Sequence, residues 1–175
     1  MTGSTKDARS LTQTVRHPFP PLCDADSRIL ILGSFPSVKS REQCFFYGHP
    51  QNRFWKVTAA VFGDAVPADI PQKKAFLHAH HIALWDVIAQ CDIAGSSDSS
   101  IRNVIPNDLS VILRSADIRQ IFVNGGTAAK YYDRFQRSRT GLDAVQLPST
   151  SPANAAWTPE KLIAAWSVIR RAADF

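Results

Sequence analysis

The chain has 175 residues, enough for one domain with a hydrophobic core. Hydrophobic residues make up 45% and charged residues 20%, which excludes a disordered chain, and no apolar run reaches the length of a membrane span. The net charge of +5 and the pI near 9.4 suit a polyanionic partner, although this balance alone is weak evidence. Residues 1–17 are polar and lack the apolar core of a signal peptide. We therefore expect a flexible N-terminal tail, a single domain over residues 18–175, and a cytoplasmic (nucleoid-associated) protein, or a nuclear one in a eukaryote.

The first half of the chain predicts two strands and two helices. Residues 28–33 form an apolar run that ends at a glycine, which is typical of a buried strand, and residues 34–51 are irregular. Asn52 can cap a helix that ends at Gly63, and a second helix begins near Pro71. Residues 81–85 form the second strand, which ends at Asp86.

The second half continues the alternation after a polar loop at residues 95–100. Asn107 can cap a short helix through Leu113, and residues 118–123 form a third strand. A helix covers residues 127–135, and a short fourth strand covers residues 144–147. The last helix opens at Thr158 and carries an apolar face of Leu162, Trp166 and Ile169.

This order of elements predicts an α/β fold, a three-layer α/β/α sandwich around a central, mainly parallel four-stranded sheet. In such sheets a ligand binds at the carboxyl ends of the strands. In this chain those ends are Gly33-Ser34, Asp86, Asn124 and Pro148-Ser149.

The sequence predicts no metal and no cofactor. The three cysteines are odd in number and far apart, at Cys23, Cys44 and Cys91, which argues against a disulfide framework and a structural zinc site. The histidines within residues 78–81 have no cysteine or carboxylate at ligand spacing. The segment after the first strand also lacks the glycine patterns of dinucleotide-binding and phosphate-binding loops.

Three segments at the strand ends carry a recognisable pattern. They are Gly33-Ser-Phe-Pro-Ser37, Tyr47-Gly-His-Pro-Gln-Asn-Arg-Phe-Trp-Lys56 and Leu147-Pro-Ser-Thr-Ser-Pro-Ala-Asn154. The second resembles the signature of mismatch-specific enzymes in the uracil-DNA glycosylase superfamily. The first, together with Leu84-Trp-Asp-Val-Ile88, resembles the hypoxanthine-DNA glycosylase branch, also called DNA-deoxyinosine glycosylases. The resemblance covers most of residues 28–157.

The resemblance implies a pocket for an extruded base, formed by Gly33, Ser34, Phe35, Tyr47 and Asp86. Tyr47 would stack on the base, a contact that tolerates any ring, although a core tyrosine is the alternative. Phe35 departs from the pattern, because most of the superfamily places Asp or Asn there to hold the attacking water. A phenyl ring can neither orient water nor accept a proton.

Asn52 and Asp86 are therefore the predicted catalytic residues. The Asn52 amide can bind water through its oxygen or donate to the leaving base, or it can serve only as a helix cap. Asp86 aligns with an Asn that reads the base edge in uracil-removing relatives. As a carboxylate it accepts hydrogen bonds only, so it can accept N1–H of hypoxanthine or act as the base that activates water. A helix cap at the strand end is its alternative role.

A third group is predicted to contact DNA. Short hydroxyls after the fourth strand suit phosphates, Ala153 or Asn154 would fill the gap left by the base, and the amides at Asn124-Gly125 could hold a phosphate or only form a tight turn. Arg53 can approach DNA or remain a solvated charge. The predicted DNA-binding residues are Ser37, His49, Arg53, Asn124, Gly125, Ser149, Thr150, Ser151, Ala153 and Asn154.

These residues predict a monofunctional DNA glycosylase that excises hypoxanthine from deoxyinosine by hydrolysis. The expected partner is double-stranded or single-stranded DNA with a deaminated base, without a membrane or an obligate protein partner. We see no lysine placed for a Schiff base, so no strand cleavage is expected. The alternatives are removal of mainly uracil or xanthine by the same fold, or a damaged-DNA or single-stranded-DNA binding module without catalysis.

Overall fold

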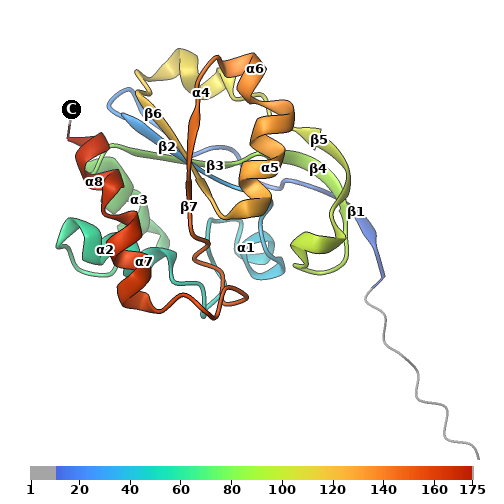
Figure 1. The fold of residues 1–175 in the computed structure, drawn as a ribbon, viewed down its shortest axis with the longest axis horizontal. Helices are drawn as coiled ribbons and strands as arrows, with labels where there is room; N and C mark the ends of the chain where they lie inside the picture. The colour runs from blue at the N-terminus through green and yellow to red at the C-terminus, as the bar shows by residue number, and fades with distance from the viewer. Residues whose placement is uncertain (1–10, 175) are drawn as a thin grey trace, which may run out of the picture.

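A four-stranded, all-parallel sheet forms the centre of the structure, a computed structural model that describes residues 11–174 (Figure 1). In spatial order its strands are β3 (Ile82–Asp86), β2 (Ile29–Gly33), β6 (Gln120–Asn124) and β7 (Ala144–Leu147). They are the four strands predicted from the sequence, with bounds that differ by two residues at most. The predicted fold class is therefore confirmed.

Helices cover both faces of this sheet. One face is packed by α2 (Phe54–Phe62), α3 (Ile70–Ala79), α7 (Pro159–Trp166) and α8 (Val168–Ala173), and the other by α4 (Ser110–Ser115) and α5 (Gly126–Phe135). Because successive side chains of a strand point to opposite faces, Ile29 and Ile31 enter the first core and Leu30 and Leu32 the second. In Figure 1, α7 lies directly beside α2.

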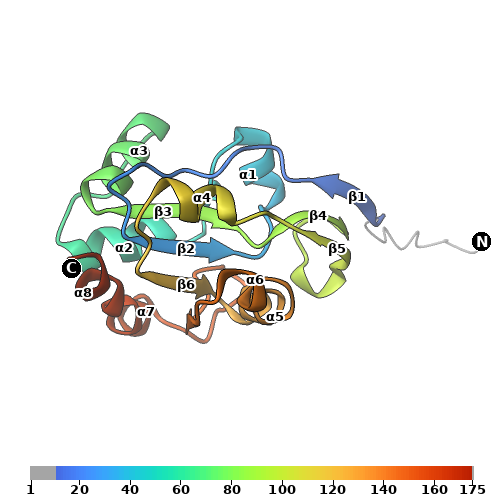
Figure 2. The same cartoon turned by 90° about the horizontal axis from the view of Figure 1, so that it is seen from above.

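A second, antiparallel sheet joins the face that carries α5. Its strands are β1 (Gln13–Arg16), β4 (Ile88–Ile93) and β5 (Arg102–Pro106), in the order β1-β4-β5. Only Val87 separates β3 from β4, so the two sheets are continuous along the chain. Figure 2 shows this small sheet at the end of the molecule opposite α7 and α8.

A flexible tail was predicted over residues 1–17. Residues 1–10 lie outside the described residues, and for residues 13–16 the prediction is wrong, because they form β1. Residues 13–16 pair with β4, from Gln13 opposite Ile93 to Arg16 opposite Gln90. The strand is mostly exposed, which is why its sequence shows no apolar pattern. Hydrogen bonds to β4, and not a hydrophobic face, therefore order this segment, and residue 17 reaches the interior of the protein.

Several shorter elements also differ from the sequence-based prediction. The segment at residues 34–51 contains α1 (Val38–Gln43), and the loop at residues 95–100 contains a 3-10 turn, η1 (Asp98–Ser100). A short helix, α6 (Arg137–Thr140), follows α5, and the last helix is divided at Ser167 into α7 and α8.

The sequence had predicted Asn107 as the cap of α4, and this prediction is wrong. Its side chain is buried and donates to the carbonyl oxygens of Asp86, at 2.8 Å, and Ile88, at 3.1 Å. These two carbonyls flank Val87, where the chain passes from β3 to β4. Asn107 therefore fixes the backbone on either side of this junction.

The parallel register brings the polar strand ends together. Gly33 at the end of β2 lies opposite Asp86 at the end of β3, and Asn124 at the end of β6 lies opposite Leu147 at the end of β7. These are the positions at which a parallel sheet offers a ligand site. None of the helices between residues 11 and 174 has both the length and the apolar character that a membrane crossing requires.

Trp166 connects the C-terminal helices to this edge of the sheet. Its fully buried indole donates from Nε1 to the carbonyl oxygen of Pro148 at 2.9 Å and packs edge-to-face on Phe54. We expect Trp166→Phe to lower the free energy of unfolding by about 2 kcal/mol or more, because it creates a void and leaves a carbonyl unpaired. Urea denaturation measures this change. Trp157→Phe, at a half-exposed position, is the control and should change stability by less than about 0.5 kcal/mol; equal losses for the two variants would contradict this role of Trp166.

Candidate active site

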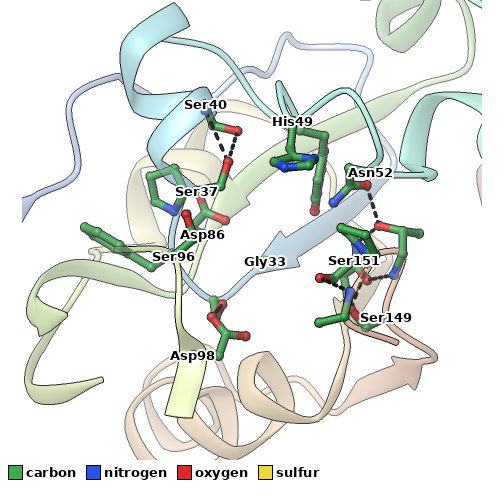
Figure 3. A pocket seen from close by; sticks show the side chains of 18 of the residues that line it. Gly33, Ser37, Ser40, His49, Asn52, Asp86, Ser96, Asp98, Ser149 and Ser151 are labelled. Atoms are coloured by element: carbon green, nitrogen blue, oxygen red, sulfur yellow. Dashed lines mark hydrogen bonds between the residues drawn. The ribbon is translucent and has the colours of Figure 1, made fainter. Parts of the chain in front are cut away.

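A cavity of about 570 Å³ opens at the carboxyl ends of the parallel strands (Figure 3). It brings together most of the site residues predicted from the sequence: Gly33, Ser34, Phe35, Ser37, Tyr47, His49, Asn52, Asp86, Asn124, Ser149, Thr150, Ser151 and Ala153. Three predicted residues lie outside this lining: Arg53, Gly125 and Asn154. Tyr47, Asn52 and Asp86, on which the predicted mechanism depends, share the one cavity.

Asp86 lies at the inner wall of the cavity beside Gly33. The residue is only 5% exposed, and a Cβ atom added at Gly33 would stand 2.4 Å from its Oδ1. Glycine at position 33 is therefore required, because any side chain would displace the carboxylate or block it. The close approach explains why the signature segment begins with a glycine at the end of β2.

His17 holds the other oxygen of this carboxylate. Its Nε2 lies 2.7 Å from Asp86 Oδ2, and its side chain is only 3% exposed. The backbone N–H of Phe19 points at Nδ1, at 3.4 Å, so the ring proton lies on Nε2 and is donated to Asp86. The sequence analysis missed His17 because it placed this residue in a tail, and no motif marks a lone histidine beyond an exposed edge strand.

Tyr47 presents one face of its ring to the protein. That face stacks on Phe54, with ring centroids 4.0 Å apart and planes at 15°. The residue adopts a left-handed backbone conformation, with φ of 51°, which is costly for a side chain this large and holds it in one orientation. The residue also lines the cavity, and the stacking of its other face on a base stays a prediction.

The hydroxyl of Tyr47 is buried, near the side chains of Asp86 and Asn124. Burial, and then the nearby charge of Asp86, raise the pKa of this phenol far above its ordinary value. The phenol therefore remains protonated and is not a proton acceptor for a reaction at this site.

The side-chain oxygen of Asn52 makes contacts within the protein. Its Oδ1 accepts hydrogen bonds from the backbone N–H of Phe54 and from the hydroxyl of Thr150, both at 2.9 Å. Two donors satisfy an amide oxygen, so this atom is not available to bind water. The remaining group is the NH₂, which is a donor. Of the predicted functions of Asn52, the structure therefore favours donation to a ligand.

Thr150 links Asn52 to the neighbouring strand end. Its backbone N–H donates to Asn124 Oδ1 at 3.1 Å, and Asn124 Nδ2 donates to its hydroxyl at 3.0 Å. The side chain of Thr150 is fully buried. Asn124 and Thr150, predicted to contact DNA, thus use these polar groups on each other and on Asn52, and they position the end of β6 against the loop after β7.

Arg53, which was predicted to contact DNA, supports the loop at residues 149–157. Its guanidinium donates to the carbonyl oxygens of Ser151, at 2.9 Å, and Asn154, at 3.0 Å, and it also reaches those of Thr150 and Trp157. The fork of N–H groups is occupied by these carbonyls, so little remains for a phosphate.

The loop at residues 149–154 is stabilised by hydrogen bonds between residues that are close in the sequence. The hydroxyls of Ser149 and Ser151 accept from the backbone N–H of Ser151 and Ala153, at 3.1 and 3.2 Å, and Asn154 Nδ2 donates to the Ser149 carbonyl. Ala153 is exposed and lines the cavity, and its role in filling the gap left by the base stays a prediction.

Gly125 lies close to Ser149, the first residue of the same loop. Its N–H is donated to the Leu147 carbonyl at 2.9 Å, so this amide does not hold a phosphate. It has a φ of 94°, and an added Cβ would stand 2.9 Å from Ser149 Cβ. The turn, and not the phosphate site, is therefore the correct interpretation of the two that the sequence allowed.

Ser37 and His49 also have local partners. Ser37 caps α1 by accepting from the Ser40 N–H at 3.2 Å, and His49 Nδ1 accepts from the Gln51 N–H at 3.1 Å. Phe35 packs edge-on against His17, with the Arg41 guanidinium over its ring at 5.7 Å. These contacts fix the phenyl ring of Phe35 at the cavity wall.

Asp98 is a second carboxylate in the cavity, which the sequence analysis treated as part of a polar loop. Its Oδ1 accepts from the hydroxyl of Ser34 at 3.1 Å. Burial of the carboxyl group raises the pKa of Asp98 and the charge of Asp86 adds to this effect, while hydrogen bonds from Ser34 and Thr127 oppose it. Its sequence position, far from the recognised segments, gave no signal.

The charges of the cavity differ from those of the whole chain. Its lining contains two carboxylates and one histidine but neither lysine nor arginine, although the chain has a net charge of +5. Its lining is rich in hydroxyl groups, from Ser34, Ser37, Ser40, Ser96, Ser97, Ser99, Ser149 and Ser151. Within residues 11–174, no three His, Cys, Asp or Glu side chains are grouped as metal ligands would be. The site can therefore stabilise positive charge and donate neutral hydrogen bonds.

Comparison with known proteins defines the class to which this fold and cavity belong. The model of the uracil DNA glycosylase superfamily matches residues 20–170, and the chain belongs to that superfamily. A protein of Methanosarcina acetivorans named hypoxanthine DNA glycosylase is 33% identical over 141 residues, which are 80% of this chain and 89% of the relative. A protein of the same name from Methanosarcina barkeri is 30% identical over 137 residues, 78% of this chain and 86% of the relative.

A solved structure confirms the fold. The solution NMR structure of a protein from Methanosarcina acetivorans, described as a candidate uracil DNA glycosylase, superposes with a TM-score of 0.79 at 31% sequence identity. The match covers 93% of this chain and all of that chain.

The role of Arg53 can be tested by Arg53→Lys, which keeps the charge but loses the planar fork. We expect the free energy of unfolding to fall by about 1–3 kcal/mol and amide exchange in residues 149–157 to become faster, because several loop carbonyls lose their donor. Hydrogen exchange read by mass spectrometry measures the loop directly. Arg119→Lys, at a surface pair with Asp117, is the control. Unchanged exchange together with a loss of DNA affinity would restore the prediction of a phosphate contact.

Proposed function

We propose that this protein is a monofunctional DNA glycosylase that hydrolyses the N-glycosidic bond of a deaminated base, with hypoxanthine in deoxyinosine as its main substrate. Membership of the superfamily and the two relatives named hypoxanthine DNA glycosylase support the reaction and the substrate. The absence of lysine from the cavity lining supports hydrolysis without a Schiff base.

The observation that carries the proposal is the fixed carboxylate of Asp86. His17 donates to Oδ2, and Oδ1 lies at the wall beside Gly33, so the cavity has an oriented acceptor. Deamination changes the edge of a base: N1 of adenine, which accepts a hydrogen bond, becomes N1–H in hypoxanthine, which donates one. An acceptor at this position therefore binds hypoxanthine and rejects adenine, because two acceptors would face each other.

The same edge pattern occurs in uracil, so the preference for a purine rests on other features. The cavity of about 570 Å³ has room for a bicyclic base, and the free face of Tyr47 gives it a surface for stacking. Extrusion from the duplex costs least for a weakly paired base, and inosine opposite thymine is such a pair. Hypoxanthine is also a better leaving group than adenine, since its ring accommodates negative charge.

The charges of the lining suit the reaction. Cleavage of the glycosidic bond leaves positive charge on the sugar and negative charge on the base. Two carboxylates in the cavity stabilise the first, and the NH₂ of Asn52 is a donor for the second. The DNA substrate, as a double or a single strand, would place its phosphates along the hydroxyl-rich lining.

Release of free base from duplexes that contain inosine, uracil, xanthine or adenine tests this function. In single-turnover assays we expect the wild type to release hypoxanthine fastest and to leave adenine in place. Asn52→Ala and Asp86→Ala should each slow the release of hypoxanthine about 100-fold or more, as loss of a group that acts in the transition state does. Full activity in both variants would overturn the site assignment. Binding of the duplexes without release of any base would identify a binding module, and faster release of uracil would reassign the substrate.

His17 provides a sharper test of the orientation of Asp86. His17→Ala removes the donor and should slow the release of hypoxanthine about 10- to 100-fold, because a buried carboxylate loses a hydrogen bond worth roughly 1.5–3 kcal/mol. His17→Gln retains an N–H donor and should recover part of the rate. His80→Ala, which changes a surface contact with Asp64, is the control. If His17→Ala matches the wild type, the pairing with Asp86 has no part in base recognition.

A further inference from the structure

The loop after β4 places the carboxylate of Asp98 at the cavity, and hydrogen bonds at both ends hold this loop in place. Arg41 of α1 donates to the Gly95 carbonyl at 2.7 Å, and the Val38 N–H donates to the hydroxyl of Ser96 at 2.9 Å. At its far end, Ser100 accepts from the Ala94 N–H at 2.8 Å and so closes the loop. Asp98, the first residue of η1, lies between these anchors, and Figure 3 shows its side chain at the cavity.

The carboxylate of Asp98 lies next to the position that lacks a group for holding water. Ser34, which donates to Asp98 Oδ1 at 3.1 Å, directly precedes Phe35 in the chain. Phe35 itself is apolar and packed against His17, so it cannot perform that task. The Asp98 carboxylate comes from a different loop, but it is hydrogen-bonded to Ser34, the residue before Phe35.

The other candidates for this task have other roles in the proposed site. Asp86 Oδ2 accepts from His17, and its Oδ1 is the acceptor assigned to the base edge, so the proposal uses this carboxylate for base recognition. Asn52 Oδ1 already has two donors. A carboxylate has about four acceptor sites, so Asp98 keeps capacity for water after accepting from Ser34.

From this geometry we propose that Asp98 is the catalytic residue that holds and deprotonates the attacking water, an inference that rests on the glycosylase function proposed above. The water oxygen forms a bond to C1′ of the sugar as the bond from C1′ to N9 of hypoxanthine breaks. The electron pair of that bond leaves with the base. One proton of the water passes to the carboxylate of Asp98, and the departing base takes up a proton from solvent.

The surroundings of Asp98 suit a proton acceptor. The ionisable groups near it are Asp86 on β3 and Cys91 on β4, and Arg41 of α1 binds the same loop. Asp98 is an exposed residue whose carboxylate lines the cavity, and partial desolvation there, together with the charge of Asp86, raises its pKa, so it accepts a proton more readily than a carboxylate free in water. The ionised form is the active one. Activity that depends on it is therefore lost as the pH falls through a pKa above the ordinary aspartate value.

Asp98→Asn tests the inference, because the amide still accepts a hydrogen bond from Ser34 but cannot take up a proton. The measurement is single-turnover release of hypoxanthine from an inosine duplex, at saturating enzyme and across a range of pH. We expect a loss of about 100-fold or more in the rate, the size typical of general-base catalysis, with the acid limb of the pH profile displaced and duplex affinity changed less than about threefold. Asp117→Asn, at an exposed surface carboxylate, is the matched control and should leave the rate unchanged.

Two further variants separate a chemical role from a structural one. Asp98→Ala should regain part of its rate when formate is added, because a small carboxylate can occupy the vacated space, whereas a folding defect would not respond. Ser34→Ala removes a hydrogen bond that lowers the pKa of Asp98, so the acid limb should move to higher pH. Wild-type rate and acid limb in Asp98→Asn would overturn the role of Asp98 while leaving the glycosylase function intact. No base release by the wild type from any duplex would overturn both.

Discussion

The hydrogen bond from His17 to Asp86 is the contact on which the chemistry of the cavity depends. It requires three separate parts of the fold: the edge strand β1, which brings the chain to His17, the end of β3, which carries Asp86, and the end of β2, where Gly33 leaves room for the carboxylate. Each part alone is unremarkable. Together they turn a flexible acid into an acceptor with a fixed direction, which is the property that distinguishes a deaminated base from its parent.

The signature segment around Asn52 acts mainly through its neighbours. Asn52 and Asn124 share Thr150, and Arg53 holds the carbonyls of the following loop. The side chains of Asn52 and Arg53 in this segment thus fix the loop at residues 149–157 against the sheet. The groups left to meet a substrate are the Asn52 NH₂, the face of Tyr47 and the two carboxylates.

The sequence predicted the central sheet because its strands are buried and apolar, and a parallel register then implies where their ends meet. It could not predict β1, whose residues are exposed and whose order comes from backbone pairing. For the same reason it missed His17. Asp98 was missed because a serine-rich loop gives no periodic signal, and only the fold shows that it returns to Ser34. The loop contacts of Arg53 could not be predicted, because a sequence shows a charge but not the carbonyls that accept from it.

The hydroxyl-rich lining of the cavity has a consequence for how binding responds to ionic strength. The binding of cationic side chains to phosphates releases counterions, whereas hydroxyls and amides displace few of them. Since the lining contains neither lysine nor arginine, we expect added salt to weaken the initial capture of DNA by basic residues outside the cavity. We expect salt to have little effect on the insertion of a nucleotide into the cavity. Encounter and extrusion are thus separable steps, the first governed by the ion atmosphere of the DNA and the second by shape and neutral contacts.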